Sequence, residues 1–242
     1  MVKYHGVKTV QHKNIIELEV AGKYAMFTGP EYRGVVRSLP VPTYEAVRGI
    51  LRAVYWKPTF IWVADEVRVM NAISTERYPV NSRYRGKYEQ ERLKDVRYQI
   101  RAHFVWNENR PEFTADRDED KHFRIALRSI SKGGRFPVYL GTAECPGEVR
   151  AVRFGSGEGA YDNSGVTDFG EMYHGVTYPD EGWDERTRSS VSRRYWHCIM
   201  NDGVIRFAPP EECRSVFVRN AEAKRFANKD TEGEVSAAGT QN

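Results

Sequence analysis

Residues 93–106, LKDVRYQIRAHFVW, alternate in polarity along almost their whole length. The apolar positions are Val96, Tyr98, Ile100, Ala102, Phe104 and Trp106. The positions between them are polar or basic and include Arg97, Gln99, Arg101 and His103. A strand with one apolar and one polar face is typical of an antiparallel sheet that covers a core on one side. This stretch therefore predicts a half-buried strand whose second face is basic.

The segments around this strand predict the rest of the first fold unit. Residues 14–28 and 59–70 favour strands, and residues 43–56 favour a helix that Thr43 caps and Pro58 ends. Residues 121–134 predict a second helix that stops at two glycines, and residues 136–141, FPVYLG, a short closing strand. The order is β-α-β-β-α-β, so we expect an α+β fold with a ferredoxin-like (RRM-like) N-terminal domain.

The remaining chain has a different texture. Residues 144–220 are rich in glycine and short strand patterns, and Asn201-Asp202-Gly203 predicts a hairpin turn. We therefore expect an N-terminal domain over residues 1–143, with a basic arm near 71–94 that forms an extended hairpin or a flexible segment. A smaller antiparallel β domain over 144–220 and a disordered tail over 221–242 complete the predicted organisation.

Composition narrows the class of protein. The chain has 242 residues, 40% of them apolar, and no run of 18 apolar residues, so we expect a globular protein without a membrane span. The N-terminus lacks the apolar core of a signal peptide. Three widely spaced cysteines indicate neither a disulfide framework nor a zinc site. These features together favour a cytoplasmic location.

The positive charge is concentrated in one part of the chain. Net charge is +4, yet residues 68–110 alone hold ten Lys/Arg and five Asp/Glu, with tyrosines interleaved. Arginines beside exposed aromatic side chains suit a flexible phosphate polymer with bases that can stack. A solvated arginine-rich loop with no ligand is the equally weighted alternative.

Two short stretches resemble known functional motifs, but neither fits its motif well. FGSGEG, residues 154–159, is not followed by a helix pattern, so it predicts structural turns and not a dinucleotide loop. The carboxylates of Asp116, Asp118, Glu119 and Asp120 lie in one short stretch. A magnesium site needs carboxylates from separate elements, so the capping of the following helix by Asp118 or Asp120 is favoured over metal binding.

Lys121 and His122 stand side by side where that helix begins. A helix N-terminus attracts phosphate, an imidazole moves protons, and an adjacent ammonium group stabilises negative charge in a transition state. Such a pair suits metal-independent RNA cleavage, in which a ribose 2′-hydroxyl attacks its own phosphate. From the pattern alone, a surface Lys-His dipeptide without function remains the favoured alternative.

Several segments together resemble one family. PVPTYEAVRGILRAVYWKPT, LKDVRYQIRAHF, RPEFTADRDEDKHF, GGRFPVYLGTAEC, FGSGEGAYD and MYHGVTYPDE occur in order from about Ile15 to beyond Phe207. They resemble the CRISPR-associated Cas-five family, specifically its d subtype from type I-C systems. The resemblance implies a ferredoxin-like domain followed by a β domain, and a metal-independent endoribonuclease of a prokaryotic cytoplasm with no cofactor. It implies cleavage of the repeat of precursor CRISPR RNA.

The resemblance also implies partners and site residues. The partners are CRISPR RNA (its 5′ handle and repeat stem-loop), the backbone and large subunits of Cascade and, through the complex, target DNA. The implied catalytic residues are Tyr44, Lys121 and His122, with no metal ligand. We expect His122 as the base and Tyr44 as a proton donor or positioner. The expected RNA-binding residues are Arg83, Arg85, Lys87, Lys94, Arg97, Arg101, Lys132 and Arg135, and Tyr84 or Tyr88 is expected to stack on a base.

Two other functions stay open from the sequence. The first is a non-catalytic Cascade subunit that only holds the 5′ handle. The second is a metal-dependent DNA nuclease that uses Asp116, Asp118 and Asp120.

Overall fold

Strands dominate the computed structural model, which describes residues 13–30, 37–82 and 86–223. The strands are β1 (Ile16–Ala25), β2 (Phe60–Val69), β3 (Thr75–Ser82), β4 (Gly86–Trp106), β5 (Val138–Tyr139), β6 (Pro146–Ala151), β7 (Val166–Thr177), β8 (Ser190–Asn201), β9 (Val204–Arg206) and β10 (Arg214–Asn220). The helices are α1 (Tyr44–Val54), α2 (Glu119–Ser131) and α3 (Glu185–Arg188). The 3₁₀ turns are η2 (Pro111–Asp116), η3 (Pro179–Glu181) and η4 (Pro210–Glu212). The α+β class predicted from the sequence is confirmed.

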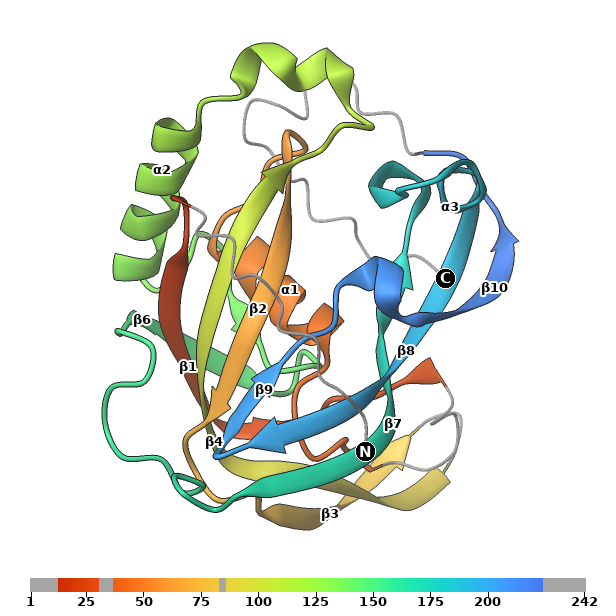
Figure 1. Ribbon diagram of the computed structural model, residues 1–242. Helices are drawn as coiled ribbons and strands as arrows, with labels where there is room; N and C mark the ends of the chain where they lie inside the picture. The colour runs from red at the N-terminus through yellow and green to blue at the C-terminus, as the bar shows by residue number, and fades with distance from the viewer. Residues whose placement is uncertain (1–12, 31–36, 83–85, 224–242) are drawn as a thin grey trace.

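The alternating stretch at residues 93–106 lies at the centre of the sheet. It is the second part of β4, which pairs antiparallel with β1 on one side and with β2 on the other (Figure 1). Ile100 lies opposite Leu18 of β1 and Val67 of β2, and all three side chains are buried. The predicted division of this strand into an apolar and a basic face is therefore correct.

The sheet has ten strands in the order β10-β8-β9-β2-β4-β1-β6-β5, with β3 paired to β4 and β7 paired to β8. FPVYLG forms the short strand expected from the sequence, at the end of this order, but it does not lie beside β1. This segment supplies only the two-residue β5, while β6 takes the place beside β1 through pairs such as Val20 with Val149. The proline and the glycines around β5 leave too few residues for a longer ladder.

Local signals set the ends of both long helices. Thr43 caps α1 by accepting a hydrogen bond from the Ala46 N–H at 3.1 Å, and Asp118 caps α2 by accepting one from the Lys121 N–H at 2.9 Å. α2 ends just before Gly133 and Gly134, which adopt φ of +82° and +107°. A side chain is strained at such angles, so these glycines end the helix as the sequence predicts.

The two long helices contribute to one core. Val47, Ile50 and Leu51 of α1 are buried, and so are Ala126 and Ile130 of α2. They belong to one hydrophobic cluster that also includes the apolar residues of β1, β2 and β4. The helices therefore cover the apolar face of the sheet, while the polar face of β4 points the other way.

The C-terminal strands continue the same sheet. β9 pairs with β2 through Val67 and Ile205, so hydrogen bonding does not stop at residue 144, where we expected a domain boundary. The division into two domains stays a prediction. β8 and β9 meet at a turn in which Asp202 and Gly203 have φ of 46° and 79°. Positive φ at both central residues is typical of a type I′ hairpin, which confirms the predicted turn.

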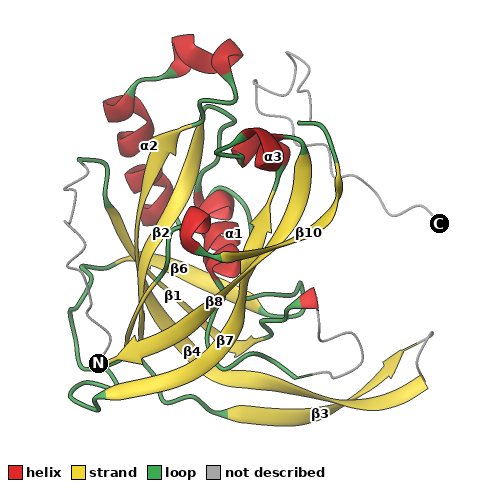
Figure 2. Ribbon diagram, turned by 45° about the vertical axis from the view of Figure 1, so that its right-hand side comes forward, coloured by secondary structure: helices red, strands yellow, loops and turns green. Residues whose placement is uncertain are grey.

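The expected basic arm is a hairpin of β3 and the first part of β4. Figure 2 shows it extending from the lower end of the sheet. The residues at its tip, 83–85, lie outside the described residues, so the expected contacts of Arg83, Tyr84 and Arg85 are not described. Over the described ranges, no helix is long and apolar enough to span a membrane.

Candidate active site

The start of α2 presents Lys121 and His122 in two different environments. The Lys121 side chain is 48% exposed, and its ammonium group lies 2.5 Å from Oδ1 of Asp116. The His122 side chain is fully buried. The helix start, fixed by Asp118, thus turns the lysine to the surface and the histidine toward the core. The two residues meet again at Asp116, because the His122 ring also lies 3.3 Å from Oδ2 of that carboxylate.

Both ring nitrogens of His122 have a partner. Nε2 lies 2.7 Å from the backbone oxygen of Asp116, and Nδ1 lies 2.7 Å from the hydroxyl of Tyr55. A carbonyl oxygen only accepts, so a neutral His122 carries its proton on Nε2. Nδ1 then holds a free electron pair and accepts the hydrogen bond from Tyr55. The three residues form a chain from Asp116 through His122 to the phenol of Tyr55.

Tyr55 reaches His122 because α1 ends there. It is the C-cap residue, with an extended backbone (φ −162°, ψ 131°), and its own N–H bonds the carbonyl oxygen of Leu51. The backbone oxygen of Tyr55 accepts a hydrogen bond from the Trp62 indole at 2.7 Å, and its ring is 1% exposed. Phe60 lies against both rings, with centroids 5.6 Å from Tyr55 and 5.3 Å from His122. This aromatic packing fixes both rings.

The carboxylate of Asp116 also has a partner in Thr59, the residue that precedes β2. Thr59 donates a hydrogen bond to its Oδ2 at 2.8 Å. Burial by itself would raise the pKa of Asp116, but the hydrogen bonds from Lys121 and Thr59 outweigh this effect and lower the pKa. Asp116 therefore stays ionised, ready to stabilise a positive charge on His122.

Burial raises the pKa of Tyr55 to about 12; the charge of Asp116 adds to this effect and Arg135 opposes it. The guanidinium of Arg135 lies 5.7 Å from the centre of the Tyr55 ring. Arg135 is brought there by its backbone N–H, which bonds the carbonyl oxygens of Ala53 and Val54 at the end of α1. Of the expected RNA-binding residues, Arg135 thus lies next to the candidate site.

Tyr44 lies in a different cluster. Its ring stacks on His174 of β7 with centroids 4.2 Å apart, and Arg48 and Arg194 each lie 5.8 Å from the ring centre. Tyr44 is the first residue of α1 and Tyr55 follows its last. At 1.5 Å per residue, eleven residues separate their backbones by about 16 Å along the helix. The structure brings Lys121 and His122 together with Tyr55 and leaves Tyr44 at the far end of α1.

The acidic stretch does not gather its carboxylates. Asp118 is occupied as the cap of α2, Asp116 pairs with Lys121, and Asp120 is exposed in the first turn. Within the described ranges, no group of three or more His, Cys, Asp or Glu side chains is arranged to hold a metal ion. The capping predicted for Asp118 is confirmed.

The expected RNA-binding arginines of β4 are paired with carboxylates. Arg97 lies 3.0 Å from Glu19, and Arg101 lies 3.1 Å from Glu17 and 2.6 Å from Glu66. We call the arginines on this side of the sheet the sheet-face arginines; they are Arg68, Arg97, Arg101, Arg150 and Arg206. Arg68 pairs with Asp162, Arg150 with Glu19, and Arg206 with Glu66.

The other expected contacts are spread over the surface. Lys87 is exposed on the arm, and Lys94 lies 4.0 Å from the neighbouring carboxylate of Asp95. Lys132 is exposed at the C-terminal end of α2. These lysines come from two distant parts of the fold, so they do not form one cluster with the candidate site.

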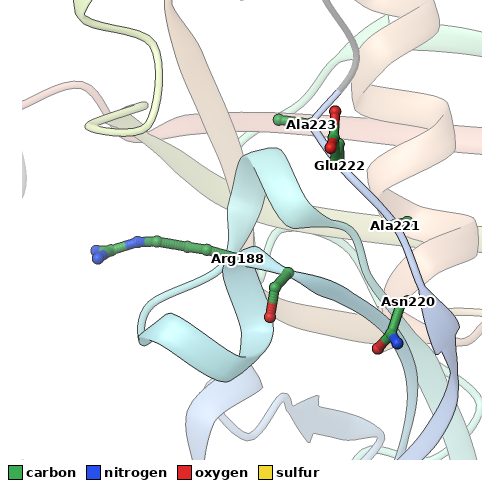
Figure 3. A pocket seen from close by; sticks show the side chains of 6 residues that line it. Arg188, Asn220, Ala221, Glu222 and Ala223 are labelled. Atoms are coloured by element: carbon green, nitrogen blue, oxygen red, sulfur yellow. The ribbon is translucent and has the colours of Figure 1, made fainter.

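A shallow surface depression lies elsewhere, where the chain leaves β10 beside α3 (Figure 3). It is lined by Arg188, Ser189, Asn220, Ala221, Glu222 and Ala223. None of the residues predicted from the sequence, and none of the Tyr55 cluster, lines it. Its position therefore adds nothing to the candidate site.

The sequence analysis did not predict the contact of Tyr55 with His122 or the contacts of Asp116 with Lys121 and His122. The dipeptide Tyr55-Trp56 ends the first helix pattern, and an aromatic residue there is read as core packing. Only the approach of α2 to the end of α1 shows that the phenol meets His122. The sequence signal that existed was a tyrosine directly before a predicted helix end, which is weak by itself.

Comparison with known proteins identifies the family of this chain. The Cas5d family model, described as CRISPR-associated protein (Cas_Cas5), matches residues 15–208. The protein named CRISPR pre-crRNA endoribonuclease Cas5d from Mannheimia succiniciproducens is 33% identical over 167 residues, which are 57% of this chain and 73% of the relative. The protein of the same name from Thermus thermophilus is 30% identical over 181 residues, 69% of this chain and 75% of the relative.

Two solved structures are also similar. A functionally uncharacterized protein from Streptococcus mutans is 35% identical with a TM-score of 0.71, over 82% of this chain and 94% of that protein. A structure described only as a CRISPR-associated protein is 37% identical with the same TM-score and the same shares of the two chains. The family model covers most of the chain, and these structures share its fold. The chain therefore belongs to the Cas5d family of CRISPR-associated proteins.

Proposed function

We propose that this protein is an endoribonuclease that cleaves the repeat of precursor CRISPR RNA without a metal ion. The observation that carries the proposal is the hydrogen-bonded chain Asp116–His122–Tyr55, with Lys121 exposed beside it. Two relatives that carry the name pre-crRNA endoribonuclease support the same activity.

The chemistry needs one proton removed and one supplied. The ribose 2′-hydroxyl loses its proton and its oxygen bonds to the adjacent phosphorus; the bond from phosphorus to the 5′-oxygen breaks, and that oxygen takes up a proton. His122 Nδ1 accepts the proton through the phenol of Tyr55, because the His122 ring is buried and Tyr55 is the hydrogen-bond partner of Nδ1. The products are a 2′,3′-cyclic phosphate and a 5′-hydroxyl.

Tyr55 is suited to donate the proton to the leaving oxygen. With a pKa of about 12 it stays protonated at neutral pH, so it is a poor base by itself. As it gives its proton to the 5′-oxygen, the proton that His122 has taken up can return to it. Asp116 stabilises the imidazolium in between, which is the role of the carboxylate in other histidine-centred sites.

Lys121 supplies the fixed positive charge. In the substrate-free chain it is paired with Asp116, whose backbone also covers the His122 ring. A phosphate that takes the place of Asp116 on Lys121 leaves that carboxylate to His122 alone. Binding of the scissile phosphate to Lys121 thus strengthens the contact between Asp116 and His122 in the existing chain.

We further propose that β1, α1, β2, β4, α2 and β6 form the ferredoxin-like framework expected from the sequence. The strand order β2-β4-β1-β6, with every neighbouring pair antiparallel, supports this assignment. The family supports a place in Cascade, with the protein retained on the 5′ handle of the processed RNA.

The test is cleavage of the cognate repeat RNA by the purified chain, with and without EDTA. We expect cleavage in EDTA, a 5′-hydroxyl product, and no cleavage when the ribose before the scissile phosphate is 2′-deoxyribose. Lys121→Gln should slow the reaction by roughly 10²- to 10³-fold, the loss typical of removing one transition-state charge. Loss of cleavage in EDTA would indicate the metal-dependent alternative, and RNA binding without cleavage would leave a structural subunit.

A further inference from the structure

The sequence around α2 carries unusually uniform charge. Residues 121–143 contain five lysines and arginines and no aspartate or glutamate. Three of these cations, Arg124, Arg128 and Lys132, are spaced by four residues and are all exposed. Residues at i, i+4 and i+8 lie on one side of a helix, with a rise of about 6 Å between successive positions. They form a row along α2, which we call the α2 row.

The row faces away from the core. The buried residues of α2 are His122, Ala126, Ser129 and Ile130, which lie between the row positions. Figure 1 shows α2 at the edge of the molecule, beside β1 and β6, with one side open. In the part of the chain that the structure describes, no carboxylate forms an ion pair with a residue of the row. The three positive charges therefore face solvent without an ion pair, and Asp120, four residues before Arg124, is the acidic residue of α2 nearest to them in the sequence.

The sheet-face arginines differ from the row in this respect. Each of them has a carboxylate within 3.2 Å, and Glu19, which pairs with Arg97 and Arg150, is itself only 2% exposed. A phosphate that bound there would have to displace a carboxylate and leave it without a partner. On the α2 row, a phosphate only has to displace water and mobile ions, so the row is the more favourable anion surface.

The α2 row begins near the candidate active site, and exposed aromatic side chains follow it in the sequence. Its N-terminal end lies one helical turn after Lys121, which stands at the candidate active site. Beyond its C-terminal end, Phe136 and Tyr139 are each 45% exposed, although both are large aromatic side chains. Exposed aromatic rings that follow a line of cations along the chain suit a nucleic-acid strand, whose bases stack while its phosphates bind the cations.

We propose that the α2 row binds successive phosphates of the RNA strand that leads away from the scissile phosphate. The spacing of the row along α2 is similar to the spacing of phosphates along one strand. The identity of the ligand as RNA rests on the proposed function; the location of the surface rests on the unpaired charges. The α2 row extends the candidate site, because it defines the course of the RNA strand beyond Lys121.

The test compares two triple variants that remove the same charge. One is Arg124→Gln, Arg128→Gln and Lys132→Gln; the matched control is Arg150→Gln, Arg206→Gln and Arg214→Gln, three exposed arginines that each pair with a carboxylate. The probe is cognate repeat RNA with 2′-O-methyl riboses, which carries every phosphate and has no nucleophile. Its dissociation constant is measured over a range of salt concentrations.

For the α2 triple variant we expect the slope of log K against log salt to fall by about 2, at 0.7 for each contact with a single strand. The same slope corresponds to binding weakened roughly 50-fold at about 0.15 M salt. The control should keep the slope of the unaltered chain. Arg128→Gln alone, a single exposed change, should lower the slope by about 0.7, and thermal unfolding checks that each variant is folded.

An unchanged slope in the α2 variants would overturn the proposal and leave an acidic protein surface as the partner to test. Equal losses in both triple variants would also overturn it, since net charge and not location would then govern binding. Because the probe cannot be cut, the result is separate from the proposed activity. Protein that binds through the row but never cleaves unmodified RNA would refute the activity alone.

Discussion

The contact between Tyr55 and His122 leads to a prediction that separates two candidate tyrosines. Tyr55→Phe removes one hydroxyl, the partner of His122 Nδ1 at 2.7 Å, and keeps the ring against Phe60. Tyr44→Phe removes the equivalent atom at the far end of α1 and keeps the ring stacked on His174. The two changes are chemically identical, so any difference between them reports on position.

The expected loss of cleavage rate follows from the loss of the hydrogen bond between Tyr55 and Nδ1 of His122. A positioned proton-transfer group contributes roughly 10²- to 10⁴-fold to a rate, which equals about 3 to 5 kcal/mol of barrier. We therefore expect Tyr55→Phe to cleave at least about 10²-fold more slowly. It should also lose about 1–3 kcal/mol of unfolding free energy, because Nδ1 of the buried His122 is left without a donor. Tyr44→Phe should change the cleavage rate by less than about twofold, since its hydroxyl lies far from the reacting atoms.

The assay is single-turnover cleavage of repeat RNA with protein in excess, so that retained product does not limit the rate. Denaturant unfolding at the assay temperature shows that each variant is folded under the conditions used. A double variant, Tyr55→Phe with His122→Ala, should be no slower than His122→Ala alone, because residues that act as one unit give non-additive losses.

Two results would refute this reasoning. Wild-type rates from folded Tyr55→Phe would show that the hydrogen bond to His122 has no catalytic role. A large loss in Tyr44→Phe with none in Tyr55→Phe would restore the assignment made from the resemblance. The structure would then have to change its helix packing on binding RNA, which hydrogen exchange in α1 would detect.

Two further predictions concern stability and binding. Burial, reinforced by Arg194, lowers the pKa of His174 from 6.5 to about 3, so the folded protein binds this proton less readily than the unfolded chain. The contribution of His174 to stability is therefore fully present above about pH 6.5 and falls by about 1.4 kcal/mol per pH unit between about pH 6.5 and pH 3. A urea titration should show a shallower decline for His174→Gln, and an equal decline would contradict the assignment. Arg97→Gln with Arg101→Gln should lower stability and leave the salt dependence of RNA binding nearly unchanged; a slope reduced by about 0.7 per arginine would instead favour the sequence-based expectation that these side chains hold phosphates.

Short-range signals account for what the sequence predicted well. Thr43 and Asp118 cap helices through bonds that span three residues, and Asp202-Gly203 forms its turn by itself. FPVYLG supplies only two paired residues, and residues 146–151 supply the strand beside β1; this choice depends on pairing with β1 and not on a local pattern. The Tyr55–His122 contact joins residues 67 positions apart, and no local pattern encodes it.

The charge pattern shows why the basic surface was hard to locate from composition. Counting along residues 68–110 treats each arginine as free, but a sheet places carboxylates of distant strands beside it: Glu17 and Glu19 of β1 lie in register with Arg101 and Gln99. An exposed helix face has no such neighbour strands, so its side chains mostly meet residues three or four positions away. Arg124, Arg128 and Lys132 have no acidic residue between them, and within the described residues none of the three forms an ion pair. On the proposed role of the α2 row, the absence of acids along a helix is a better sequence signal for an anion-binding surface than an excess of arginine along a strand.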